Sequence, residues 1–72
     1  MRAERLVSMA NDIGAFWAAD ADKAEAAKNI ASHLRRFWDP RMRRQIVAYY
    51  REGGAGLNDI VRSAIAILAE GS

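Results

Sequence analysis

Cysteine is missing from this sequence of 72 residues, which contains one histidine, His33, and one proline, Pro40. Without cysteine the chain can form neither a disulfide nor a thiolate metal site. A lone histidine makes a histidine-based metal site equally unexpected, because such sites take several protein ligands. Small proteins usually gain stability from disulfides, metals or partners. We therefore expect this chain to depend on packing and on a partner, and to hold no metal.

Long apolar runs are missing as well. No stretch approaches the roughly 20 consecutive apolar residues that a transmembrane helix needs, so no membrane partner is expected. Residues 1–14 carry spaced charges and no continuous apolar run, which is not the pattern of a signal peptide. With no cysteine and no targeting signal, the expected location is the cytoplasm.

What is present is the composition of a folded protein. Hydrophobic residues make up 51% of the chain and charged residues 28%, a balance that disordered segments do not have. The length predicts a single helical domain over residues 1–72. A core this small supplies only about 3–5 kcal/mol of stability on its own.

The apolar residues recur at steps of three and four, which predicts amphipathic helices. Four are expected, at about residues 2–19, 23–38, 40–52 and 58–70. No run alternates with the period of two that a strand requires. The predicted fold is therefore all-α, a small bundle of three to four short helices.

Local signals set the ends of these helices. Asp20 or Asp22 is expected to cap the second helix, and Asp39 to cap the third, with Pro40 at its first position. The chain should turn sharply there, because the residue before proline avoids helical angles. Gly53 is expected to end the third helix and to open a flexible connector that runs to residue 56.

Six large aromatic side chains are many for a chain of this length. At helical spacing such residues are usually core, which is the expectation for Phe16, Phe37 and Trp38. Trp17 and Tyr50 are expected to be partly exposed, since tryptophan, tyrosine and arginine are enriched at interface hot spots. The core residues predicted from the apolar stripes are Leu34, Phe37, Ile46, Ile60 and Ile65.

No group of residues suggests catalysis by this chain. The carboxylates lie outside the apolar stripes, where they act as helix caps or face solvent. His33 lies at the edge of the second stripe, which favours a half-buried structural role. No serine, cysteine or lysine has an activating neighbour beside it. We expect no catalytic residues.

Arginines form the most informative feature. Six arginines and one aspartate lie between Arg35 and Arg51, a local net charge of +5 in a chain whose overall charge is +2. At about 100° per residue, Ile46 and Tyr49 face the same way as Met42, whereas Arg41, Arg44 and Arg51 face the opposite way and Arg43 lies on the flank. Arginine at a helix start opposes the helix dipole, which makes sense if an anion is expected there.

Residues 37–45, FWDPRMRRQ, closely resemble the central motif of the delta subunit of NAD-dependent, molybdenum-containing formate dehydrogenases. Residues 6–17, LVSMANDIGAFW, are similar to the family's opening helix, which reads "MANQI…FF/W". The glycine-rich break before a short final helix is similar too.

The resemblance implies a small subunit without a redox centre of its own. Its partner would be the large catalytic alpha subunit of a formate dehydrogenase that also contains iron–sulfur and flavin subunits. The family is thought to assist insertion or sulfuration of the bis-molybdopterin guanine dinucleotide cofactor, with transient contact and no stable binding. Whether such a chain is a passing chaperone or a permanent subunit, and whether the metal is molybdenum or tungsten, stays open.

Carried over onto this sequence, the resemblance indicates candidate residues. Arg41, Arg43 and Arg44 are the candidate contacts to phosphate or another anion, because an arginine fork pairs with phosphate bidentately. The residues expected from this motif to contact a partner are Trp38, Asp39, Pro40, Arg41, Met42, Arg43 and Arg44. Trp17 and Tyr50 are added because they are expected to be partly exposed. The alternative functions are a nucleic-acid-binding module and a self-assembling helical protein.

Overall fold

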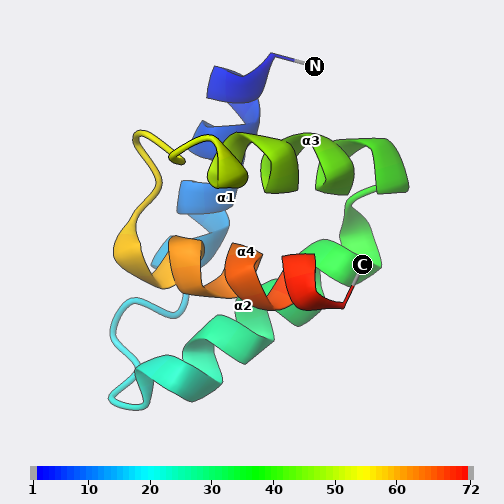
Figure 1. Ribbon diagram of the computed structural model, residues 1–72. Helices are drawn as coiled ribbons and strands as arrows, with labels where there is room; N and C mark the ends of the chain where they lie inside the picture. The colour runs from blue at the N-terminus through cyan, green and yellow to red at the C-terminus, as the bar shows by residue number, and fades with distance from the viewer. Residues whose placement is uncertain (1, 72) are drawn as a thin grey trace.

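The structure, a computed structural model, describes residues 2–71 and contains four helices (Figure 1). They are α1 (Ala3–Ala15), α2 (Lys23–Phe37), α3 (Pro40–Arg51) and α4 (Asp59–Glu70). No strand occurs in this part of the chain. The prediction of a small all-α bundle is therefore confirmed; the end residues 1 and 72 of the predicted domain lie outside the described residues.

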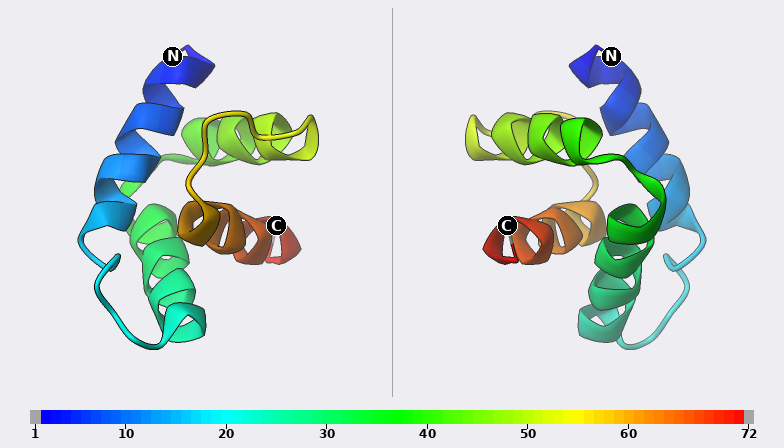
Figure 2. Two further views of the ribbon diagram at one scale, coloured as in Figure 1. Left: turned by 90° about the vertical axis from the view of Figure 1, so that its left-hand side faces the viewer. Right: turned by 90° about the vertical axis from the view of Figure 1, so that its right-hand side faces the viewer.

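The helices cross around one apolar centre. α3 and α4 run antiparallel beside each other, joined by the loop at the left of Figure 1, while α1 crosses behind them. α2 and α4 form the most extensive helix pair. Figure 2 shows the sharp corner between α2 and α3, where Trp38 and Asp39 are both extended. The predicted turn at Asp39 and Pro40 is thus present.

Short-range chemistry explains where α2 begins and where α3 ends. The Asp22 carboxylate accepts from the Glu25 N–H at 3.0 Å, which caps α2. The third helix ends in a Schellman motif, in which the Gly54 N–H donates to the Tyr49 carbonyl at 3.0 Å and Gly53 has a φ of 123°. Only glycine takes such angles without strain.

The first helix is shorter than the sequence predicts, because it ends at Ala15 rather than near residue 19. Beyond Ala15 the backbone bonds tighten, with the N–H of Phe16 donating to Ile13 and that of Trp17 to Gly14. These bonds span three residues instead of four, the pattern of a helix that closes in a 3₁₀ turn. The tighter winding turns Trp17 onto the bundle, where it packs against the core.

The core is built from aliphatic residues on all four helices. Leu34, Ile46 and Ile65 are fully buried as predicted, and Ile60 is partly buried against them. Alanine makes up much of the buried face of α2. Because alanine has so small a side chain, α4 can lie close along this face. The side chains buried in the core cluster are Leu6, Val7, Ala10, Ala27, Ile30, Ala31, Leu34, Trp38, Ile46, Val47, Leu57, Val61, Ala64, Ile65 and Leu68.

Two of the aromatic predictions are wrong. Phe16 is 84% exposed and Phe37 is 70% exposed, although both were expected in the core. Each stands at the end of its helix, Phe37 as the last residue of α2 and Phe16 just beyond α1. Helical spacing gives the direction of a side chain, but it does not tell whether another element covers the helix end. Trp38, in contrast, is buried as expected.

The connector after α3 is not the flexible segment that its glycines suggest. Arg62 donates to the carbonyls of Gly53 and Gly54 at 2.7 and 2.9 Å, and the Tyr49 hydroxyl donates to Ala55 at 2.6 Å. Asn11 of α1 donates to the Gly56 carbonyl at 2.9 Å. All four carbonyls of residues 53–56 therefore accept a side-chain hydrogen bond. The sequence could not show this, because the donors lie as many as 45 positions away.

Candidate functional site

The start of α3 lies at the centre of the predicted site, and two of its residues have structural roles. The Asp39 carboxylate accepts from the Met42 N–H at 2.9 Å, so it caps the helix. Pro40 occupies the first turn, where its missing N–H costs nothing. These two residues fix the direction of α3 and thereby the positions of the arginines that follow.

Trp38 was predicted to contact a partner, but it is only 5% exposed. Its backbone ends α2, with its N–H donating to the Leu34 carbonyl at 2.9 Å, and its indole belongs to the core cluster. A buried ring cannot meet a partner without unfolding the chain. Trp38 therefore packs in the core beneath the start of α3 and does not form part of the exposed surface.

Arg43 also departs from the prediction. It was expected to lack a structural role, yet its Nη1 donates to the carbonyls of Arg35 and Trp38 at 2.7 and 3.0 Å. Because the last carbonyls of a helix have no partner within the helix, this bond pair caps α2. The buried face of α3 is centred on Ile46, Val47 and Tyr50, so Arg43 points inward instead of lying on the flank.

Arg41 and Arg44 are exposed, as predicted from the helical wheel. Within residues 2–71 neither forms an ion pair; the ion pair in this part of the chain joins Lys28 and Glu25. The first turn of α3 contains no acidic residue that could offset their charge. The Asp39 carboxylate that caps the helix is the acidic group at this end, and it precedes two exposed arginines, so an external anion would still be favoured there.

The remaining predicted partner residues are half-buried and lie on different elements. Met42 and Tyr50 are half-buried and pack against the core from the outside. Trp17 is also half-buried, and Tyr50 and Trp17 are partly exposed as expected. Trp17 lies away from α3, in contact with His33 at a ring-centroid distance of 6.0 Å. The structure therefore does not gather all the predicted residues at one place.

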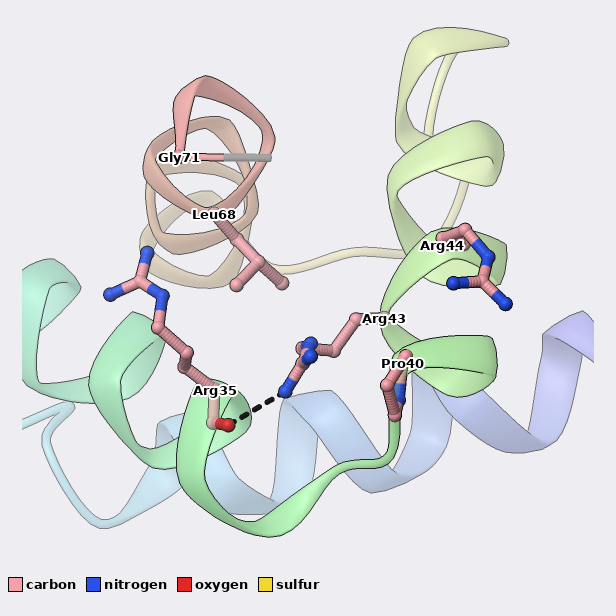
Figure 3. A pocket seen from close by; sticks show the side chains of 6 residues that line it. All are labelled: Arg35, Pro40, Arg43, Arg44, Leu68 and Gly71. Atoms are coloured by element: carbon pink, nitrogen blue, oxygen red, sulfur yellow. Dashed lines mark hydrogen bonds between the residues drawn. The ribbon is translucent and has the colours of Figure 1, made fainter.

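A hollow of about 310 Å³ opens between the end of α2, the start of α3 and the end of α4. Figure 3 shows Arg43 reaching into the space between the helices, with Arg35 on the opposite wall beside Gly71. Arg44 stands at the rim, and its guanidinium turns away in this view. The lining residues are Arg35, Pro40, Arg43, Arg44, Leu68 and Gly71. Because Arg43 donates to backbone carbonyls and Arg44 turns away, Arg35 is the guanidinium that a single phosphate or carboxylate group would meet in this hollow.

Sequence reasoning missed Arg35 as a lining residue, although it counted toward the local charge of +5. Arg35 belongs to a different helix from Arg43 and Arg44, and only the corner at Pro40 brings these residues together. The signal was the run of arginines on both sides of the proline. Arg35 is also favourably placed for a structural reason, since a cation near the end of α2 complements the helix dipole.

The described residues offer neither a metal site nor a membrane segment. No group of three histidine, cysteine or acidic side chains comes together within residues 2–71. In the same range, each helix is too short or too polar to cross a lipid bilayer.

Comparison with protein families matches residues 5–65 to the family described as the NADH-dependent formate dehydrogenase delta subunit, FdsD. The chain belongs to this family. The matched range contains both similar segments, residues 6–17 and 37–45, together with the capped corner between α2 and α3. No curated protein and no solved structure matches the chain.

Membership in the FdsD family implies that part of the surface of this chain contacts other subunits. The family is that of a subunit of a formate dehydrogenase, so the other subunits of that complex are partners of the chain. The exposed arginines of α3 and the exposed rings at the ends of α1 and α2 are the parts of the described surface whose chemistry suits such contacts.

Proposed function

We propose that the chain is a non-catalytic accessory subunit that docks on the large catalytic alpha subunit and assists completion of its molybdopterin cofactor. The observation that carries the proposal is the pair Arg41 and Arg44, exposed at the start of α3 without an ion pair in the described part of the chain. Arginine pairs bidentately with carboxylates and phosphates, which are the groups expected on a partner surface and on the cofactor.

The size of the hollow supports a transient contact with the cofactor. A space of about 310 Å³ lies at the lower end of the range for small-molecule pockets, and a cofactor of two pterin dinucleotides is far larger than the ligands such pockets enclose. The hollow can therefore receive one phosphate group but not the whole cofactor. Held against Arg35 near the start of α3, a phosphate would be steadied while the alpha subunit receives the rest of the cofactor. When bound in the alpha subunit, the cofactor supplies the redox chemistry of formate oxidation.

The proposal is tested by producing the formate dehydrogenase with and without this chain. Without it, we expect the complex to contain normal iron and flavin but less active cofactor, and to oxidise formate more slowly per alpha subunit. The measurement is metal, molybdopterin and activity per alpha subunit. Adding the purified chain to finished, fully active enzyme should leave its rate unchanged. Full cofactor content and full activity in enzyme made without the chain would overturn the maturation role.

A further inference from the structure

A second surface lies away from the arginines of α3, and four rings form it. Phe16 contacts Trp17 at a ring-centroid distance of 6.4 Å, Trp17 contacts His33 at 6.0 Å, and His33 contacts Phe37 at 4.7 Å. We refer to these four residues as the aromatic cluster. It joins the end of α1 to the last two turns of α2.

The aromatic cluster is the most exposed apolar part of the described surface. Phe16 and Phe37, at 84% and 70% exposure, are the large hydrophobic side chains that stand out from the bundle. Single exposed apolar residues need no explanation, but a contiguous cluster of rings is typical of a binding surface. Aromatic rings bring large contact area with few rotatable bonds, so they are enriched at the centres of interfaces.

A hollow of about 210 Å³ lies within this surface. Its lining residues are Trp17, Asn29, Ser32, His33, Arg36 and Phe37. No carboxylate lines it, and Arg36 is exposed without an ion pair in the described part of the chain. The surface thus combines an apolar centre with a rim of hydrogen-bonding groups and one arginine, the anatomy of a protein interface.

We propose that the aromatic cluster is a second docking surface, which receives a segment of another formate dehydrogenase subunit that carries an apolar side chain flanked by carboxylates. The apolar side chain would enter the hollow between Trp17 and Phe37, and a carboxylate would pair with Arg36. Charge complementarity selects an acidic segment, because the rim offers a guanidinium and no negative group. The identity of the partner rests on the proposed function, in which the chain is a bound subunit.

This surface is separate from the hollow of about 310 Å³ that Arg35, Arg43 and Arg44 line. The two hollows have no lining residue in common. His33 and Arg35 are two positions apart on α2, which places them about 200° apart around the helix axis. Substitutions on one surface therefore leave the other intact, and the two can be tested independently.

The test measures binding to formate dehydrogenase complex purified from cells that lack this chain. The double variant Phe16→Ala/Phe37→Ala should raise the Kd at least about tenfold, since truncated aromatic hot spots have effects of this size or larger. Its thermal unfolding should match that of the unsubstituted chain, because both rings are exposed. Lys28→Ala, an exposed charge on α2 that lines neither hollow, is the control and should leave the Kd unchanged.

A second pair of variants tests the acidic character of the partner. Phe37→Glu and Phe37→Lys remove the same ring but add opposite charges. Phe37→Glu should weaken binding several-fold more than Phe37→Lys, and the difference should shrink as salt concentration rises. Equal losses for the two variants at all salt concentrations would overturn the proposal of an acidic segment.

The remaining outcomes separate this inference from the proposed function. If the unsubstituted chain binds the complex and the double alanine variant binds equally well, the aromatic cluster is not a docking surface, while the proposed function stands. If the unsubstituted chain does not bind at all, both fail. If sedimentation shows a dimer of the free chain that the double variant disperses, while the Kd for the complex is unchanged, the surface joins two copies and the inference is overturned.

Discussion

Arg43 and Arg44 are neighbours in the sequence and have opposite roles in the structure. The Arg43 guanidinium donates to two carbonyls at the end of α2 and so ties that helix to α3. The Arg44 side chain is exposed and forms no ion pair within the described residues. Residue type alone cannot distinguish them, because each role uses the same planar set of donors.

We predict that Arg43→Ala lowers the free energy of unfolding by about 1.5–3 kcal/mol, the usual cost of losing hydrogen bonds from a charged group. Arg44→Ala should lower it by an amount within experimental error, since exposed charges contribute little. Urea unfolding followed by circular dichroism compares the two variants directly. Equal stabilities would show that the bonds from Arg43 do not hold α2 and α3 together.

Contacts between helices explain a glycine that looks unfavourable in the sequence. Gly14 lies in the last turn of α1, where glycine costs up to about 1 kcal/mol relative to alanine. It is buried, and a Cβ at this position would lie 2.5 Å from Cγ2 of Val61 on α4. Glycine is therefore required for the close approach of α1 and α4, and the lost helix propensity is the cost of this approach.

We predict that Gly14→Ala destabilises the protein by about 1–3 kcal/mol, as overpacking of a core does, although alanine favours the helix itself. The matched variant is Gly14→Ala combined with Val61→Ala, which removes the atom that the new Cβ would meet. The double variant should then show a smaller loss than the sum of the two single losses. Additive losses in chemical denaturation would mean that the two side chains do not clash.

The molecule as a whole presents two kinds of exposed surface on a small core. α3 carries the exposed Arg41 and Arg44, and the aromatic cluster lies at the ends of α1 and α2. A bundle of this size has a limited margin of stability, so a partner that binds only the folded state raises the free energy of unfolding. The FdsD family, a family of enzyme subunits, is consistent with such dependence on a partner.

We predict that the double variant Arg41→Ala/Arg44→Ala stays folded, because both side chains are exposed, and binds the alpha subunit more weakly. The weakening should be greatest at low salt, where exposed charges act over the longest range. Co-purification of the tagged chain with the alpha subunit at two salt concentrations measures this effect. Lys28→Ala, an exposed charge on α2, is the control; unchanged recovery of the double variant would remove the two arginines from the interface.

Much of the fold follows from the sequence because its signals are local. Asp22 and Asp39 cap the helices that they precede, and Pro40 begins α3, since a cap needs only the amide groups of the next turn. The apolar stripe of α2 likewise predicted that Leu34 is buried. The motif of residues 37–45 also sufficed to indicate the family.

Tertiary structure decided several features that the helical wheel did not give. The exposure of Phe16 and Phe37, the inward turn of Arg43 and the ordered connector after α3 all depend on how each helix is rotated and where its neighbours end. These properties arise from contacts between residues far apart in the chain, such as Asn11 with Gly56. Helical periodicity gives the direction of a side chain from its own axis, but the packing of the other helices determines whether that direction leads to the core or to solvent.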